Sequence, residues 1–284
     1  MQRRFPDLIC IGAQKAATTW FDEMLRRDAA FYVPAFKELH YFTQVHQPEM
    51  EFARTHRTAR AAEVKRFILA NPDHPKGPKL VAEAELLGRP VVDDNWYGTV
   101  FGHALPEQFC VETSPRYLHL PAAGIEHLLR LNPSVKILLF VRDPVDRAWS
   151  HIRMNLARGV IANEEAVLSG QWLKQYVGLS EYRDSMTLWR KLSAPGQINT
   201  LLYDDVASDP VSVLSRVYGI CGVALPRKWG AIHREVHKGQ DIDFPRVLRA
   251  KLLARLAPQY EFLSLEVPEA VARWKAKHEA AMSG

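Results

Sequence analysis

The chain has 284 residues, 47% of them hydrophobic and 24% charged, a composition that fits a globular protein with a sizeable core and excludes a disordered chain. Its formal net charge of +5 is too small to argue for a nucleic-acid-binding protein. Cys10, Cys110 and Cys221 are far apart, which excludes a disulfide scaffold and a zinc ribbon. No apolar run reaches the ~20 residues that cross a bilayer. We therefore expect a soluble, cytoplasmic protein.

Apolar, β-prone runs alternate along the chain with segments of helical periodicity. They predict buried strands at Leu8–Gly12, at residues 109–112, which is the weakest of the runs, at Lys136–Val141 and at residues 199–203. Strands that alternate with helices indicate an α/β protein with a mainly parallel central sheet flanked by helices. From residue 244 onward the pattern predicts one or two terminal helices.

The first strand is followed by a loop that is suited to binding an anion. Backbone N–H groups at a helix start lack partners and the helix dipole favours negative charge, so Lys15, Thr18 and Thr19 are expected to bind a phosphate. The loop is not a Walker A motif, because Gln14 precedes the lysine and Ala16 follows it. The alternative is an ordinary strand-to-helix turn.

Residues 43–100 differ in character from the rest of the chain. Between residues 51 and 79, seven basic residues stand against three acidic ones, and this excess of +4 is most of the net charge of the whole chain. We interpret the segment as an insertion or a lid over the site. The alternative is a solvated helix face followed by a loop.

The strand at Lys136–Val141 also ends at a residue that could bind an anion. Arg142 stands there, where open α/β sheets bind ligands, and Asp143 is placed to cap a helix that begins at Pro144. Ser150 follows two turns into that helix, and Gly159 is a plausible end for it. A guanidinium and a hydroxyl suit a phosphate, and pairing of the arginine with a carboxylate is the alternative.

Two patterns near the end of the chain argue weakly for a metal ion. His233 and His237 are four residues apart, but they do not form an HExxH motif, and Asp241 and Asp243 form a DxD tripeptide of a kind that is common by chance. We therefore expect no metal.

The two strand-to-helix junctions together resemble known sequence motifs. Gly-Ala-Gln-Lys-Ala-Ala-Thr-Thr at residues 12–19 resembles the 5′-phosphosulfate loop of sulfotransferases, and residues 140–151 resemble their 3′-phosphate motif. These enzymes use 3′-phosphoadenosine 5′-phosphosulfate (PAPS). The resemblance is greatest to heparan-sulfate sulfotransferases and their bacterial relatives.

Other segments support the resemblance. Residues 37–42 resemble the segment that carries the family's catalytic glutamate, residues 111–118 resemble its Glu-Lys-Thr-Pro-x-Tyr segment, and residues 238–240 resemble a late Lys-Gly-Arg loop. Thr113 stands where many relatives carry a lysine, and Gln240 replaces the common arginine. These departures concern acceptor binding and loop closure.

The resemblance implies roles for individual residues. It makes Lys15 and Glu38 catalytic, with Glu38 as the general base that takes the acceptor's proton. The residues expected to bind PAPS are Gln14, Lys15, Ala16, Ala17, Thr18, Thr19, Trp20, Arg142, Ser150, Lys238, Gly239 and Gln240. The residues expected near the acceptor are His40, Trp96, Tyr97, Thr113 and Arg116. For Glu38 the alternative is a surface ion pair with Lys37, and for Trp96 and Tyr97 it is core packing.

The resemblance further implies a single domain over residues 1–284 with a P-loop-like, three-layer fold. The expected activity is metal-independent, in-line transfer of the PAPS sulfuryl group to a hydroxyl or amine of an acceptor, such as a carbohydrate or a secondary metabolite. A nucleotide kinase and a non-catalytic binder of anionic polymers are the alternatives. The acceptor and the oligomeric state are not readable from the sequence.

Overall fold

Five parallel strands form one sheet in the order β2-β3-β1-β4-β5. The computed structural model describes residues 3–35, 37–75, 77–168, 170–226, 232 and 242–283. The strands are β1 (Leu8–Gly12), β2 (Phe31–Tyr32), β3 (Phe109–Thr113), β4 (Lys136–Val141) and β5 (Ile198–Leu202). In the central strand, Ile9 is in register with Glu112 of β3 and with Ile137 of β4. The predicted α/β class with a parallel central sheet is confirmed.

The strand bounds follow from burial. β1 and β4 lie where they were predicted, because central parallel strands are covered on both faces and have continuous apolar sequences. β5 ends one residue earlier than predicted, because Tyr203 begins the helix α11 (Tyr203–Ser208). β2 has only two residues, which is too short for a sequence pattern to predict.

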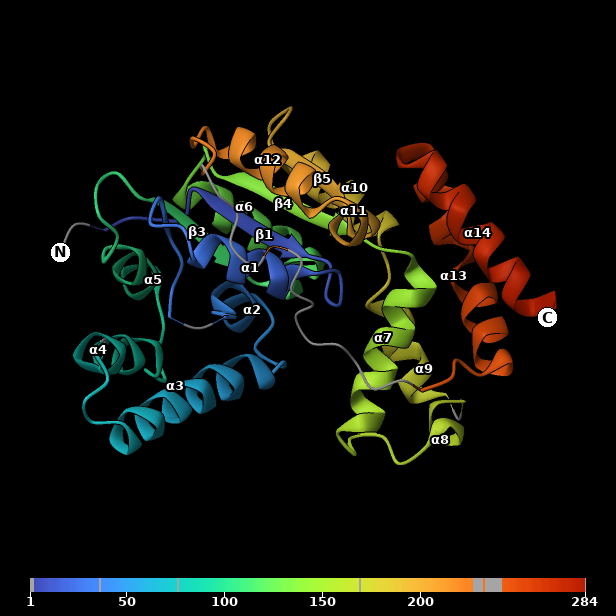
Figure 1. Cartoon of the computed structure of the whole chain (residues 1–284), viewed down its shortest axis with the longest axis horizontal. Helices are drawn as coiled ribbons and strands as arrows, with labels where there is room; N and C mark the ends of the chain where they lie inside the picture. Colours follow the sequence, from blue (N-terminus) through green and yellow to red (C-terminus); the bar gives the residue numbers. More distant parts are fainter. Residues whose placement is uncertain are drawn as a thin grey trace.

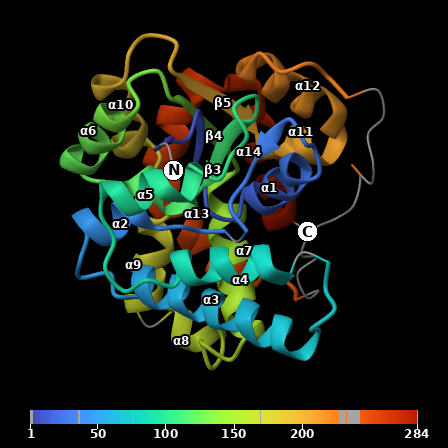
Figure 2. The same cartoon turned by 90° about the vertical axis from the view of Figure 1, so that its left-hand side faces the viewer.

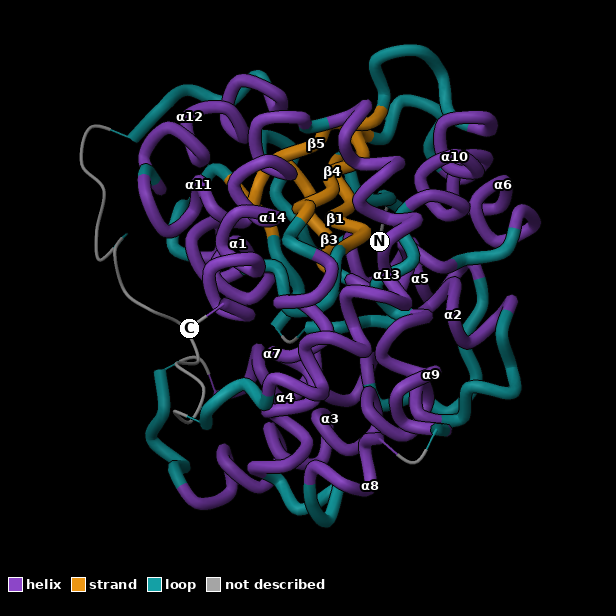
Figure 3. The backbone as a smooth tube through the Cα atoms, turned by 90° about the vertical axis from the view of Figure 1, so that its right-hand side faces the viewer, coloured by secondary structure: helices purple, strands orange, loops and turns teal. Residues whose placement is uncertain are grey.

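Helices cover both faces of the sheet. On one side lie α1 (Thr18–Arg26), α11 and α12 (Pro210–Cys221), and on the other lie α6 (Ala122–Leu131) and α10 (Arg183–Leu192), as Figure 2 shows. The opposite view in Figure 3 has the same arrangement, with the strands between the two groups of helices. Phe21 and Leu25 of α1 are fully buried against the sheet, at the helical spacing that the sequence predicts. The fold therefore has the three expected layers.

Residues 43–100 are mostly helical. They contain most of α2 (Tyr41–His46), then α3 (Phe52–Ala70), α4 (Gly77–Leu87) and α5 (Asp94–Phe101). α3 and α4 pack together away from the sheet (Figure 1). Arg57 is buried and donates to the carbonyls of Leu87 and Arg89, whereas Arg54 and Arg60 are exposed. The basic segment therefore contains at least one structural arginine.

Another group of helices surrounds the end of β4. It comprises α7 (Pro144–Ala157), α8 (Glu164–Leu168), α9 (Gln171–Gly178), and the terminal pair α13 (Arg246–Glu266) and α14 (Pro268–Ser283). α13 packs against both α7 and α14, and a short 3₁₀ helix, η1 (Pro115–His119), follows β3. Two terminal helices are thus present, within the expected range. None of the described helices has the length and apolar character needed to cross a membrane.

Candidate active site

The loop after β1 is closely packed and leads directly into α1. The N–H of Ala13 donates to the carbonyl of Phe140 at the end of β4, at 2.9 Å, so the two neighbouring strand ends are joined. A Cβ on Gly12 would lie 3.1 Å from the Cβ of Leu118, which explains a glycine there. No side chain caps the start of α1 at Thr18. The first turn therefore presents N–H groups to an anion.

Lys15 is partly buried and has no acidic partner among the described residues. Its Nζ lies 3.4 Å from the Sδ of Met154, a weak acceptor. Burial, together with the positive charge of Arg142, lowers the pKa of Lys15 to about 8. An ammonium in this setting is stabilised by any anion that binds beside it.

Arg142 lies at the end of β4, next to the loop. Its Nη1 donates to the carbonyl of Lys15 at 2.6 Å, and its guanidinium lies 4.1 Å from the centroid of the Tyr203 ring. Its Nε is buried without a hydrogen-bond partner in the part of the chain that the structure describes. No carboxylate there pairs with it either, so the alternative of a carboxylate partner does not account for this arginine. Ser150 is partly buried in α7.

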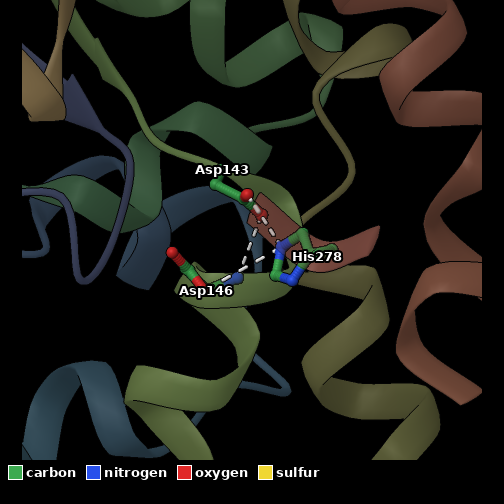
Figure 4. A group of neighbouring side chains, drawn as sticks. All are labelled: Asp143, Asp146 and His278. Carbon is green, nitrogen blue, oxygen red and sulfur yellow. Dashed lines mark hydrogen bonds and ion pairs between the residues drawn. The ribbon is translucent and has the colours of Figure 1, made fainter. Parts of the chain in front are cut away.

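Asp143, which follows Arg142 at the end of β4, contacts the C-terminal helices α13 and α14. Its Oδ1 accepts from the backbone N–H groups of Val145 and Asp146, which confirms the predicted cap, and from the hydroxyl of Tyr260 at 2.7 Å. Its Oδ2 lies 2.9 Å from Nε2 of His278, and Figure 4 shows the histidine reaching it from α14. Although burial opposes ionisation, the hydrogen bond from His278 holds the pKa of Asp143 below its usual value.

The same three side chains have the atom types of a metal site. The ligand atoms of Asp143, Asp146 and His278 lie within 4.8 Å of one another. Each of them already has a protein partner, because Lys277 pairs with Asp146 and Nη1 of Arg249 donates to Nδ1 of His278 at 2.9 Å. We therefore interpret the group as a structural anchor.

Glu38 lies on the segment that precedes α2, and its side chain is 18% exposed. Its Oε2 lies 3.2 Å from Nε2 of His40. Burial raises the pKa of Glu38, the charge of Lys37 opposes the rise, and Asp22 adds to it. Burial and the neighbouring His56 lower the pKa of His40 to about 3, so His40 is neutral and its contact with Glu38 is not an ion pair between two charges.

Lys37 has a place that the sequence did not indicate. The sequence suggests an ion pair with Glu38 for this lysine, but its Nζ donates to Oγ1 of Thr18 at 2.9 Å and to Oγ1 of Thr19 at 3.2 Å. No Lys37–Glu38 ion pair is present within these described residues. The lysine thus links the segment of Glu38 to the start of α1. The only sign of this role in the sequence was the position of Lys37 beside Glu38, in a segment that resembles the family's catalytic motif.

Glu112 is a second carboxyl group that sequence reasoning missed. It is buried in β3 and accepts from Ser114 Oγ at 2.7 Å and from the hydroxyl of Tyr97. Burial raises the pKa of Glu112 to about 7, and the charge of Glu38 adds to the effect. Asp22, Lys37, Glu112 and Thr113 line one small pocket. A polar residue inside an apolar strand was the signal in the sequence.

The residues expected near the acceptor occupy different settings. Trp96 is 3% exposed, and its indole N–H donates to the carbonyl of Leu86. Tyr97 is 1% exposed and stacks on Tyr41, with the two ring centroids 4.7 Å apart. Core packing accounts for both rings, so neither is part of an open acceptor surface in this structure. Thr113 is buried, and its Oγ1 has no partner among the described residues.

The remaining predicted residues are placed only in part. Gln14, Ala16, Ala17 and Trp20 lie in or directly after the loop, and Trp20 Nε1 donates to the carbonyl of Ile232 at 3.0 Å. The described residues do not include Lys238, Gly239 and Gln240, nor His233, His237 and Asp241.

The chain is similar to proteins of one family. The profile of the Sulfotransferase family matches residues 6–227. Among solved structures, a sulfotransferase from Alicyclobacillus acidocaldarius has a TM-score of 0.64 at 22% identity, covering 96% of this chain and 99% of that chain. A sulfotransferase domain from the curacin biosynthetic pathway has a TM-score of 0.55 at 14% identity, with 90% and 98% coverage. The sulfotransferase domain of the Synechococcus PCC 7002 olefin synthase has 0.52 at 15% identity, with 90% and 96% coverage.

The two kinds of similarity carry different weight. At these identities the structures establish a shared fold, as expected from the five-stranded sheet and its flanking helices. The family match concerns the sequence itself and includes both junctions, from the residues before β1 to those after α12. Because that match spans well over half of the residues, this chain belongs to the sulfotransferase family.

Proposed function

We propose that this protein transfers the sulfuryl group of PAPS to a hydroxyl or amine of an acceptor, with Glu38 as the general base. The observation that carries the proposal is the pair of cations at two adjoining strand ends. Nη1 of Arg142 donates to the backbone carbonyl of Lys15 at 2.6 Å, and neither side chain has a carboxylate partner among the described residues. A cation held away from water without an anion costs free energy unless a ligand supplies the anion.

The donors at this corner fit the anionic groups of PAPS. The buried, unpartnered Nε of Arg142 and the hydroxyl of Ser150 would hold the 3′-phosphate, and the start of α1 with Thr18 and Thr19 would hold the 5′-phosphate. When bound, PAPS supplies the sulfuryl group and the phosphate oxygen from which it departs. Lys15 would place its positive charge where that oxygen becomes negative.

The protein's own part in the reaction is to remove a proton and to hold charges in place. A carboxylate with a raised pKa is a stronger base near neutral pH, which suits Glu38 to accept the acceptor's proton at its free oxygen, Oε1. Nε2 of His40 lies 3.2 Å from the other oxygen, Oε2, and limits where the carboxyl group can lie. Lys37 holds the two threonine hydroxyls and keeps a positive charge between the base and the loop. Sulfuryl transfer, like phosphoryl transfer, depends mainly on such positioning.

Calorimetry with adenosine 3′,5′-bisphosphate (PAP), the product nucleotide, tests the nucleotide part of the proposal. We expect PAP to bind and ATP–Mg²⁺ to bind at least about tenfold more weakly, since ATP has no 3′-phosphate for Arg142. A kinase would give the opposite order. That result would overturn the proposal.

An acceptor screen with radiolabelled PAPS then tests the base. For any acceptor that is found, Glu38→Gln should lower the turnover number by roughly 10²–10⁴-fold while the affinity for PAP stays nearly unchanged. The matched control is Glu51→Gln, which changes an exposed carboxylate and should keep full activity. Equal turnover in the Glu38 variant and the wild type would remove Glu38 from the mechanism.

A further inference from the structure

Arg116 of η1 is a partly buried arginine with no oxygen partner among the described residues. Its Nη2 lies 3.1 Å from the Sδ of Met50, a weak acceptor, and its guanidinium lies 6.0 Å from the centroid of the Phe52 ring. Its Nε is buried without a partner among the described residues. Glu49 is the acid that favours its charged form, yet no ion pair joins the two in the described structure. An arginine keeps its charge at any ordinary pH, so burial of Nε without a partner costs free energy.

Other buried arginines in the same fold have oxygen partners, although Nε of Arg57 and Nη1 of Arg147 are also buried without a partner among the described residues. Arg57 donates to two backbone carbonyls and to Oε1 of Gln44, at 3.0 Å. Arg147 donates to Ser180 Oγ and to the carbonyl of Tyr176 at 2.8 Å. Because these structural arginines have oxygen partners, the lack of one at Arg116 indicates a ligand site rather than a packing role.

Arg116 lies close to the segment of Glu38, because the ring of Phe52 lies between them. The ring centroids of Phe52 and His40 are 5.3 Å apart on one side, the guanidinium of Arg116 lies 6.0 Å from the Phe52 centroid on the other, and Nε2 of His40 lies 3.2 Å from Oε2 of Glu38. Helix α3 also contacts His40, because the ring centroids of His40 and of His56 in α3 are 5.3 Å apart. The Nδ1 atoms of His40 and His56 are buried and, like Nε of Arg116, have no partner among the described residues.

We infer that Arg116 binds an oxyanion carried by the acceptor, a carboxylate or a phosphate, with His56 of α3 as a second contact. The inference rests on the proposed function and adds the chemical class of the acceptor. A guanidinium pairs with two oxygens of such a group at once and so fixes its orientation. The acceptor's reactive hydroxyl or amine is thereby held toward Glu38.

The test uses simple probes on protein that is saturated with PAP. Benzoate and phenylphosphonate carry the two oxyanions, and benzamide is the neutral match. Calorimetry is done on the wild type, on Arg116→Gln and on the control Arg66→Gln, an exposed arginine of α3. We expect at least one anion to bind the wild type and the control, with at least about tenfold loss in Arg116→Gln, since charge-assisted hydrogen bonds are lost. Benzamide should bind all three proteins equally weakly.

Each contrary result overturns the inference. These results are anion binding that Arg116→Gln does not change, absence of binding of both anions to the wild type, and benzamide binding as tightly as benzoate. PAP affinity, which should be the same in Arg116→Gln, reports that the variant is folded. If that variant binds PAPS more weakly but PAP equally well, the arginine holds the sulfuryl group and the acceptor assignment is wrong.

The two proposals fail in different ways. Failure of PAP to bind the wild type would overturn the proposed function, while the anion titrations on the unloaded protein would still report on Arg116. Binding of PAP without binding of either anion would overturn only the inference about the acceptor.

Discussion

The protonation of Lys15 should make nucleotide binding depend on pH. Burial and the charge of Arg142 lower its pKa to about 8. A phosphate bound beside the ammonium favours the charged form and raises the pKa again. If the proposed function holds, PAP should therefore bind the protonated protein more tightly, with full affinity below about pH 8 and a fall in affinity as the pH rises through that value.

The magnitude follows from the protonated fraction. With a pKa of about 8, nearly all of Lys15 is charged at about pH 7 and about a tenth of it at about pH 9. Since the apparent dissociation constant is divided by the fraction that is competent to bind, PAP should bind about tenfold more weakly at the higher pH. The phosphates of PAP complete their own ionisation below this range, because their second pKa is about 6.

Calorimetry in two buffers with different ionisation enthalpies measures both the affinity for PAP and the number of protons taken up on binding. At about pH 9 the wild type should take up close to one proton for each PAP bound. Lys15→Met should bind weakly at every pH and take up none, whereas Lys251→Met, which changes an exposed lysine of α13, should behave as the wild type does. A flat profile in the wild type, or the same slope in Lys15→Met, would refute the reasoning.

Three further substitutions test other contacts of the site. Arg142→Ala should weaken PAP binding by roughly 1.5–3 kcal/mol and leave adenosine 5′-phosphate, which lacks the 3′-phosphate, nearly unaffected; equal losses in calorimetry would contradict the assignment. His278→Ala leaves Oδ2 of Asp143 without its partner, so urea denaturation should give a free energy of unfolding lower by about 1–3 kcal/mol, and an unchanged midpoint would argue against the anchor. Tyr97→Phe removes a donor from Glu112 and should lower the free energy of unfolding by about 1–3 kcal/mol without changing the KM for the acceptor, whereas a raised KM at unchanged stability would restore the acceptor role of Tyr97.

Local features were readable from the sequence because neighbouring residues determine them. A parallel strand that is buried on both faces has a continuous apolar sequence, so the bounds of β1 and β4 could be predicted. The cap at Asp143 depends on residues two and three positions away. Positive residues directly after two such strands indicated Lys15 and Arg142 as anion ligands.

The sequence could not show which distant groups these residues contact. Lys37 stands beside Glu38 in the chain, yet its hydrogen bonds run to Thr18 and Thr19 of α1. Trp96 looked equally suited to an acceptor surface and to the core, and its burial against α4 decided for the core. Composition and spacing do not separate the two settings, because tryptophan is highly buried on average but seldom fully buried, so the packing of the helices decides.

The sequence by itself determined the α/β class, the central strands and the family of this protein, and it predicted an anion-binding loop after β1. The tertiary structure decided the rest of the site, because its contacts join residues that are far apart in the chain. Adjacency of β1 and β4 brings Lys15 within reach of Arg142, and α14 returns to hold Asp143 through His278. Whether a partly buried arginine such as Arg116 has an oxygen partner is likewise a property of the packed chain.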